Sequence, residues 1–204
     1  MDRGTKLSLV TILTLIRFPM VLLFLAGALV YTASPANWLF AACMVTVIAS
    51  AVTDFFDGFL ARKLEVQTTF GAHVDPLMDK FFYLATLPLL IFVAAHNEHW
   101  MHASFLVVLT VLFLTRDQWV TFLRAMGSLY NVSGAAHWSG KLRTAINFPL
   151  ICTVYYFEEA PWPFFHAGFV YAFEGFALLI NMISIYTYTR RYWPCLRRSA
   201  NVHH

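Results

Sequence analysis

Four aspartates in one short stretch are the residues of this chain best suited to chemistry. Asp54 and Asp57 lie three residues apart, and Asp75 and Asp79 lie four apart. On a helix, either spacing places both side chains on one face, so two facing helices would bring the four carboxylates together. Such a group repels itself unless cations neutralise it, and all-oxygen ligands favour hard ions such as Mg²⁺, Mn²⁺ or Ca²⁺ over zinc. The aspartates therefore predict a divalent-metal site.

Small residues and one cation accompany the aspartates. Gly58, Ala61 and Gly71 leave room for a ligand or another backbone to approach closely. Arg62 supplies a positive charge that suits an anion such as a phosphate. The alternative is that the stretch forms two amphipathic helix ends with solvated acids. Charges at membrane depth cost roughly 2.5–3.5 kcal/mol each on insertion scales, and this cost counts against that alternative.

Together these positions resemble the signature of the CDP-alcohol phosphatidyltransferase family. The match covers Asp54, Asp57, Gly58, Ala61, Arg62, Gly71, Asp75 and Asp79. The resemblance implies that an alcohol attacks the β-phosphorus of a CDP-activated lipid and that CMP leaves. It also implies two Mg²⁺ or Mn²⁺ ions per site, and four metal ligands: Asp54, Asp57, Asp75 and Asp79.

The same resemblance implies roles for individual residues. Asp79 becomes the candidate general base, which takes the proton from the attacking hydroxyl. The residues expected to contact the CDP-lipid are Asp57, Gly58, Ala61, Arg62 and Gly71.

A second region resembles one branch of that family, the bacterial phosphatidylglycerophosphate synthases. Their fourth helix carries Arg-Glu and a later Arg, and their fifth begins with Gly-Lys-x-Lys-Thr followed by Gln. This chain instead has Asp117, Arg143 and Asn147 at three of those positions, and each substitution keeps the charge sign or the amide. Asp75-Pro76 also differs from the Asp-Met typical of inositol-phosphate users. The resemblance therefore implies glycerol 3-phosphate as the acceptor and CDP-diacylglycerol as the donor.

Four basic residues in this region are candidates for binding the acceptor phosphate: Arg116, Arg124, Lys141 and Arg143. Lys141 and Arg143 are two residues apart and do not share a face of a regular helix. Both can reach one phosphate only if Gly140 and Lys141 lie in the turn before the helix. The alternative is that these residues are the basic flanks of membrane spans. A cardiolipin synthase, with phosphatidylglycerol as acceptor, has no need of such a pocket.

Composition indicates an integral membrane protein. Of the 204 residues, 59% are hydrophobic and 12% are charged, and the mean hydropathy is +0.63. Crossing the roughly 30 Å hydrocarbon core takes about 20 apolar residues. We predict an all-α fold with six transmembrane helices, near 8–31, 37–60, 72–95, 101–125, 140–158 and 162–188. The first run is too long for a cleaved signal peptide and contains Arg17, so we expect it to remain after the short juxtamembrane segment Met1–Lys6.

Basic residues predict the orientation of these helices. When the spans are threaded alternately, the connections 32–38, 95–99 and 158–163 contain no Lys or Arg, and they carry Glu98, Glu158 and Glu159. All Lys and Arg fall at the chain ends and around the second and fourth connections: Arg3, Lys6, Arg17, Arg62, Lys63, Lys80, Arg116, Arg124, Lys141, Arg143, Arg190, Arg191, Arg197 and Arg198. The positive-inside rule then predicts that both termini and the active site face the cytoplasm, with the protein in the inner membrane.

The chain is expected to form one domain over residues 1–204, with a core of about 7–190. The family resemblance implies a homodimer, and we expect membrane lipids but no nucleic acid as partners. A divalent-cation transporter is the alternative from another class. It would need polar groups continuing across the midplane, whereas only Glu174 lies deeper than the aspartates. A structural hydrogen bond is the favoured role of Glu174, ahead of a dimer contact.

Overall fold

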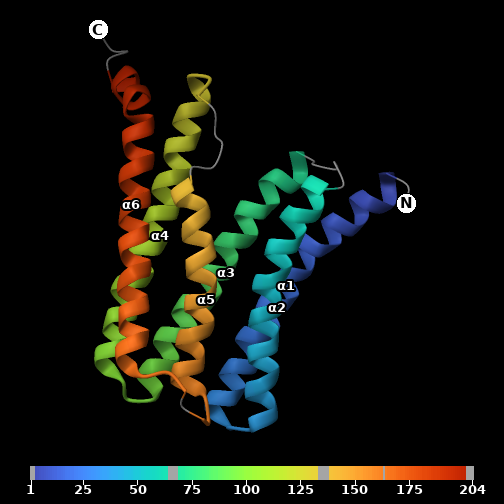
Figure 1. Cartoon of the computed structure of the whole chain (residues 1–204), viewed down its shortest axis with the longest axis vertical. Helices are drawn as coiled ribbons and strands as arrows, with labels where there is room; N and C mark the ends of the chain where they lie inside the picture. Colours follow the sequence, from blue (N-terminus) through green and yellow to red (C-terminus); the bar gives the residue numbers. More distant parts are fainter. Residues whose placement is uncertain (1–2, 64–68, 133–137, 163, 201–204) are drawn as a thin grey trace. The chain divides into compact units, whose positions relative to one another are not determined.

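The computed structural model consists of six helices within the residues it describes, which are 3–63, 69–132, 138–162 and 164–200. Figure 1 shows them in chain order: α1 Arg3–Ala33, α2 Asn37–Lys63, α3 Thr69–His96, α4 Trp100–Leu129, α5 Trp138–Glu159 and α6 Ala167–Ala200. For these residues, the predicted all-α fold is confirmed, and the number of helices matches the six predicted.

Four of these helices contain apolar stretches long enough to cross a membrane: Thr11–Ala33, Leu77–His96, Trp100–Leu129 and Ala167–Ala200. A shorter apolar stretch in α2 covers Asn37–Thr53. α5 is less apolar because it carries Arg143, Asn147 and two glutamates. Apolar side chains are also exposed on the helices, including Leu23 at 67% and Leu179 at 54%. A helix that is apolar on its exposed face is typical of a protein surrounded by lipid.

Two helices end in the same way, on a residue with a positive φ angle. Glu98 (φ 62°) follows α3, and Asn131 (φ 56°) follows α4. Beyond them, the amide of His99 donates to the carbonyl of Ala94 (2.9 Å), and the amide of Val132 donates to that of Gly127 (3.0 Å). These are Schellman motifs, which satisfy carbonyls at a helix end. Asn accepts the left-handed conformation readily, whereas Glu does so less often.

Several helix boundaries differ from the predicted transmembrane spans, and the largest difference is at the end of α6, which continues to Ala200 instead of ending near 188. α6 begins at Ala167, five residues after the predicted start at 162, and the backbone carbonyl of His166 accepts the amides of Phe169 (2.9 Å) and Val170 (3.3 Å). α4 continues to Leu129 instead of ending at 125. At the start of α6 and the end of α4, hydropathy marked the apolar run, but hydrogen bonding at the helix end determined where the helix begins or stops.

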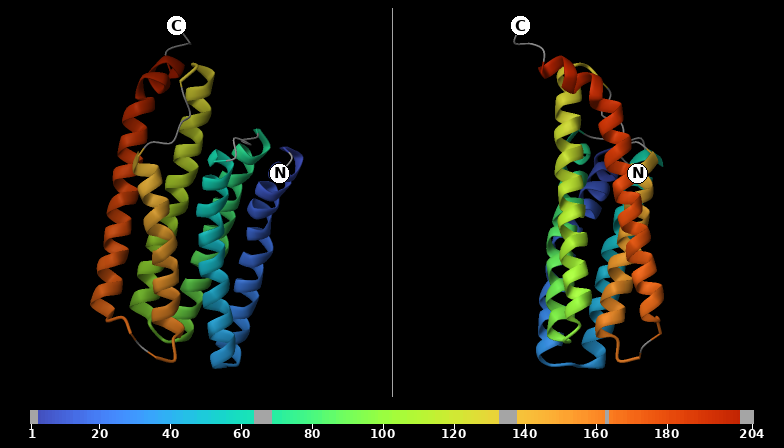
Figure 2. Two further views of the ribbon diagram at one scale, coloured as in Figure 1. Left: turned by 45° about the vertical axis from the view of Figure 1, so that its right-hand side comes forward. Right: turned by 90° about the vertical axis from the view of Figure 1, so that its left-hand side faces the viewer.

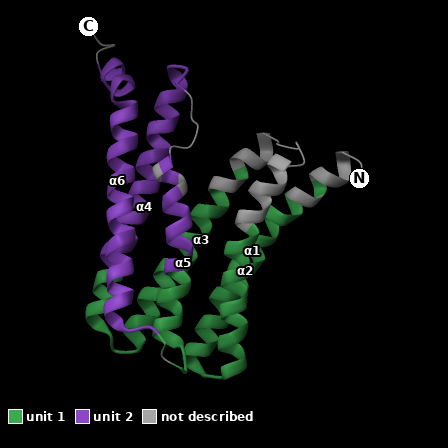
Figure 3. Cartoon of the chain, in the orientation of Figure 1, with its two compact units in different colours: residues 1–106, 151–164 green, residues 107–150, 165–204 purple. Residues whose placement is uncertain are grey.

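The chain divides into two compact units, drawn in different colours in Figure 3. Unit 1 comprises residues 1–106 and 151–164, and unit 2 comprises 107–150 and 165–204. In unit 1, α1 packs against α2 and α3, and Figure 2 shows the short turn that joins α1 to α2. The core of unit 1 includes Phe24 and Tyr155, whose ring centroids are 4.9 Å apart.

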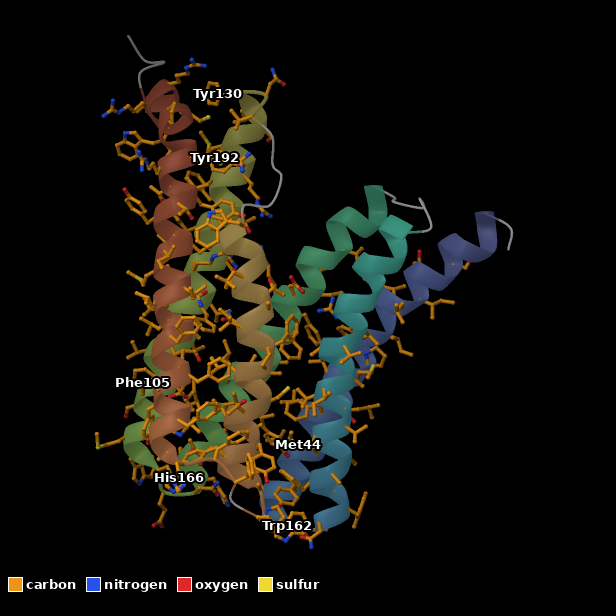
Figure 4. The ribbon with its side chains drawn as sticks, in the orientation of Figure 1. Met44, Phe105, Tyr130, Trp162, His166 and Tyr192 are labelled. Atoms are coloured by element: carbon orange, nitrogen blue, oxygen red, sulfur yellow. The ribbon has the colours of Figure 1, made fainter. Side chains whose placement is uncertain are left out.

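Unit 2 contains a hydrophobic cluster between α4 and α6. Its buried members are Val120, Leu123, Tyr188, Tyr192 and Cys195. Tyr130, just beyond the end of α4, packs against this cluster, and Figure 4 labels it together with Tyr192.

Polar contacts in unit 1 bring three helix ends together. Glu158, near the end of α5, contacts His102 and lies 2.8 Å from Nδ1 of His99. Its backbone carbonyl accepts Asn97 Nδ2 at 2.7 Å, just after α3. Thr32, near the end of α1, donates to Glu159 Oε1 at 3.2 Å. The ends of α1, α3 and α5 therefore meet, so these helices run in the same direction, as alternate threading requires.

Burial of Glu159 makes the stability of the protein dependent on pH. Loss of water around its carboxyl group raises the pKa to about 7 from an ordinary 4.5, and the nearby charge of Glu158 raises it further, against an opposing hydrogen bond from Thr32. The folded state therefore binds a proton that the unfolded state has released. Between about pH 5 and pH 7, this term lowers the free energy of unfolding as pH rises.

We expect Glu159→Gln to remove that term. Thermal unfolding in detergent, measured from about pH 5 to pH 7, should show a stability difference between wild type and variant that changes with pH. Glu98→Gln is the control, because Glu98 is an exposed acid in a nearby connection. A constant difference between wild type and Glu159→Gln across this range would contradict the assignment.

Candidate functional site

The helices carry the aspartate pairs at the predicted spacing. Asp54 and Asp57 lie in α2, and Asp75 and Asp79 lie in α3. The side chains of Asp54, Asp57 and Asp75 are outside the described residues, so the meeting of four carboxylates stays a prediction. The same holds for the predicted CDP-lipid residues Gly58, Ala61, Arg62 and Gly71. Among the side chains that the structure describes, no group of three or more His, Cys, Asp or Glu is arranged to hold a metal ion.

Asp79 contacts a buried cation from another helix. Arg17 of α1 donates from Nη2 to Oδ1 of Asp79 at 3.1 Å. The Arg17 side chain is 2% exposed, whereas that of Asp79 is 31% exposed. The guanidinium group therefore holds one oxygen of Asp79 from the protein side, while the carboxylate keeps access to its surroundings. A charged hydrogen bond of this kind orients a carboxylate and offsets part of its negative charge.

In unit 2, Asp117 joins two arginines that the sequence predicted as phosphate ligands. Arg143 of α5 contacts both carboxylate oxygens of Asp117, with a distance of 3.1 Å from Nη2 to Oδ2. Arg116 donates from Nη1 to Asp117 Oδ1 at 2.9 Å. All three residues are less than 9% exposed. The two-oxygen contact with Arg143 matches the planar fork of a guanidinium group and holds α4 to α5.

Two further contacts come from α6. Arg116 donates from Nε to Ser184 Oγ at 3.1 Å, and Arg124 donates from Nη2 to the Tyr188 hydroxyl at 3.0 Å. The structure thus brings Arg116, Arg124 and Arg143 into one network within unit 2. In the contacts described there, Asp117 pairs with Arg116 and Arg143, while Arg124 contacts the neutral hydroxyl of Tyr188. These described contacts contain three guanidinium groups and one carboxylate, an arrangement that suits an anion.

Lys141 does not lie where it would have to be if it and Arg143 were to bind the same phosphate. α5 begins at Trp138, so Gly140 and Lys141 belong to the helix and not to the turn before it. Lys141 and Arg143 therefore do not share a face of a regular helix. The side chain of Lys141 is outside the described residues, and its role in binding phosphate stays a prediction.

Sequence reasoning missed Ser184 and Tyr188. Their signal was the spacing of two polar side chains four residues apart, which places them on one face of α6. It also left Asn181 unassigned, although this residue donates to Asn147 Oδ1 at 3.3 Å in the interior of unit 2. Glu174 is completely buried within a single chain, which favours an internal contact over a dimer contact.

The fold and these residues define a helical membrane protein with an acidic region and a cluster of arginines, two of which are buried. The family model of the CDP-alcohol phosphatidyltransferases matches residues 7–186. This chain therefore belongs to the CDP-alcohol phosphatidyltransferase family.

Individual relatives carry a more specific name. A protein of Sodalis glossinidius is 30% identical over 152 residues, which are 73% of this chain and 77% of the relative. Proteins of Yersinia pestis (strain Pestoides F) and Pectobacterium atrosepticum are 30% and 29% identical over 142 residues, which are 68% of this chain and 71% of each relative. Each is named CDP-diacylglycerol–glycerol-3-phosphate 3-phosphatidyltransferase.

The contact between Arg17 and Asp79 generates a test of catalysis. We expect Arg17→Ala to lower kcat by about tenfold or more, because loss of a charged hydrogen bond of roughly 1.5–3 kcal/mol leaves Asp79 less well oriented. Arg17→Lys should retain part of the activity, because it keeps the charge without the fork of donors. Steady-state rates of CMP release on folded, purified variants provide the measurement. If Arg17→Lys loses as much activity as Arg17→Ala, the expected benefit of keeping the positive charge is contradicted.

Proposed function

We propose that the protein transfers the phosphatidyl group of CDP-diacylglycerol to glycerol 3-phosphate, which yields phosphatidylglycerophosphate and CMP. Membership of the family supports the class of reaction, and the names of the relatives support this pair of substrates. The observation that supports the choice of acceptor is the network of the buried Arg116 and Arg143 and the half-buried Arg124, whose described contacts include one carboxylate. The negative charge of a phosphate monoester is complementary to these three guanidinium groups.

The family generally uses divalent metal ions. The donor set of this chain fits such ions, because four carboxylates lie on two helices at spacings that favour one face of each. Mg²⁺ or Mn²⁺, two ions per site, would be held by Asp54, Asp57, Asp75 and Asp79. When bound, the ions neutralise charge on the pyrophosphate of the donor.

The remaining chemistry is assigned to side chains of this protein. Asp79 takes the proton from the acceptor hydroxyl as that oxygen attacks the β-phosphorus, and Arg17 orients the carboxylate. Gly58, Ala61 and Gly71 allow the cytidine to lie close to the backbone, with Arg62 near the phosphates and Asp57 shared between metal and nucleotide. The acyl chains of the donor remain in the bilayer.

Six membrane crossings with both termini in the cytoplasm are part of this proposal. Support comes from unit 1, where the ends of α1, α3 and α5 meet through Glu158 and Glu159. The turns 34–36 and 97–99 contain no Lys or Arg, which suits the outer side of an inner membrane. The active site would then face the cytoplasm, and the chain would act as a single domain in a homodimer.

The acceptor is tested directly with the purified protein. CDP-diacylglycerol is offered together with glycerol 3-phosphate, inositol phosphate, serine or phosphatidylglycerol, and CMP release is measured for each. We expect glycerol 3-phosphate to give the highest rate. Predominant activity with phosphatidylglycerol would instead identify a cardiolipin synthase, and predominant activity with either of the others would also overturn the proposal.

The aspartates should separate into two groups. Asp54→Asn, Asp57→Asn and Asp75→Asn should each abolish activity and weaken Mn²⁺ binding, because each removes a charge that helps to hold the ion. Asp79→Asn should lose turnover but retain appreciable binding of CDP-diacylglycerol, because its main proposed task is proton removal. Titration with Mn²⁺ and with the nucleotide lipid distinguishes the groups. Near-normal turnover in Asp79→Asn would remove this residue from the mechanism.

The basic residues of α5 should affect the acceptor alone. We expect Arg143→Ala to raise the KM for glycerol 3-phosphate by about tenfold or more, since it loses a charged hydrogen bond of roughly 1.5–3 kcal/mol. Lys141→Ala should raise this KM less, because Lys141 lies on a different face of α5. The KM for CDP-diacylglycerol should change little.

Arg198→Ala serves as the control for those variants, because Arg198 is an exposed arginine near the end of α6. If the basic residues only set topology, Lys141→Ala and Arg143→Ala will lower expression or insertion. The kinetics of the surviving protein will then be normal.

A further inference from the structure

Tyr188 of α6 is a completely buried aromatic residue in contact with two arginines of α4. Its hydroxyl oxygen accepts a hydrogen bond from Arg124 Nη2 at 3.0 Å. The guanidinium carbons of Arg116 and Arg124 both lie 5.4 Å from the centroid of its ring. At this distance, the negative face of an aromatic ring attracts a cation, and the attraction is stronger where water is excluded. One side chain thus contacts both arginines.

The surroundings of Tyr188 hold it in place. A Cβ atom at Gly140 of α5 would lie 2.8 Å from the Tyr188 hydroxyl oxygen, so a larger residue there would require the tyrosine to move. The ring of Tyr192, one turn further along α6, is nearly parallel to that of Tyr188, with centroids 6.5 Å apart. Val120 and Leu123 of α4 complete the packing. Close packing of this kind leaves few alternative rotamers.

Ser184 extends the same face of α6 by one turn. Its hydroxyl oxygen accepts Arg116 Nε at 3.1 Å, and it is completely buried. Arg116 and Arg124 are eight residues apart, which places them on one face of α4. Two residues of α6 therefore hold two long side chains of α4 before any ligand arrives. Ordering an arginine on binding costs side-chain entropy, and an arginine that is already ordered avoids much of that cost.

We infer that Tyr188 is a positioning residue for the acceptor phosphate and that it acts by holding Arg124 and Arg116 through its hydroxyl group and its ring. The inference rests on the proposed function, because it names the element that shapes the phosphate site. It assigns α6 a part in substrate binding, although α6 carries none of the aspartates or predicted phosphate ligands.

Tyr188→Phe is the direct test, because it removes the hydroxyl group and keeps the ring. We expect the KM for glycerol 3-phosphate to rise about threefold to tenfold, which is less than loss of a charged hydrogen bond to the ligand itself would give, because Tyr188 acts through Arg124. The kcat and the KM for CDP-diacylglycerol should remain within about twofold of wild type. Tyr192→Phe is the matched control, because Tyr192 is equally buried on the same helix and lies outside the described contacts of Arg116 and Arg124.

Gly140→Ala provides a second, independent test. The added methyl group should displace the Tyr188 hydroxyl and raise the KM for glycerol 3-phosphate, as Tyr188→Phe does. In the double variant with Tyr188→Phe, the hydroxyl group is absent and the crowding is relieved, so the two effects should not add. Additive effects in this cycle would show that Gly140 acts by another route and would count against positioning by Tyr188.

The outcomes also separate this inference from the proposed function. If wild-type protein uses glycerol 3-phosphate but Tyr188→Phe leaves its KM unchanged, the positioning role is overturned and the proposed function stands. If wild-type protein prefers an acceptor without a phosphate group, both are overturned. A rise in the acceptor KM in Tyr188→Phe, with normal values in Tyr192→Phe, supports the inference.

Discussion

Ionised side chains inside an apolar helical protein must find partners, because transfer of a lone charge out of water costs several kcal/mol. This constraint organises both units of the chain. Arg17 and Arg143 are both almost completely buried; Arg17 contacts Asp79, and Arg143 contacts Asp117. In each case the two partners come from different helices. The pairing therefore limits how the helices of a unit can rotate and slide against each other.

The same constraint explains why the buried glutamate Glu158 and the arginines of unit 2 have different kinds of partners. Glu158 has a side chain with no exposed surface, and two histidines and an asparagine surround it, so its polar atoms are well supplied with partners. Among the contacts described in unit 2, two arginines pair with one carboxylate and a third, Arg124, contacts the neutral Tyr188 hydroxyl. The first arrangement joins helix ends. The second places three cations around one described carboxylate, which suits the binding of an anion.

Neutral groups complete the arginine network. Ser184 and Tyr188 supply oxygen acceptors, and the ring of Tyr188 supplies a negative face, so the arginines are ordered without being neutralised. A carboxylate in place of Tyr188 would hold the arginines more strongly but would cancel the charge that a phosphate needs. This is a physical reason for an aromatic residue at a position surrounded by cations.

The amino-acid sequence by itself determined the helical class, the membrane character, the family and the spacing of the aspartates, because hydropathy and i, i+3 or i, i+4 spacing are local properties of one helix. It predicted Arg116, Arg124 and Arg143 as a basic group, but not what holds them. Only the tertiary structure decided that Tyr188 and Ser184 of α6 would meet them, that Arg17 would reach Asp79, and that Gly140 would lie inside α5. Partners on different helices depend on the rotation and register with which whole helices pack, and no local pattern in either helix encodes these.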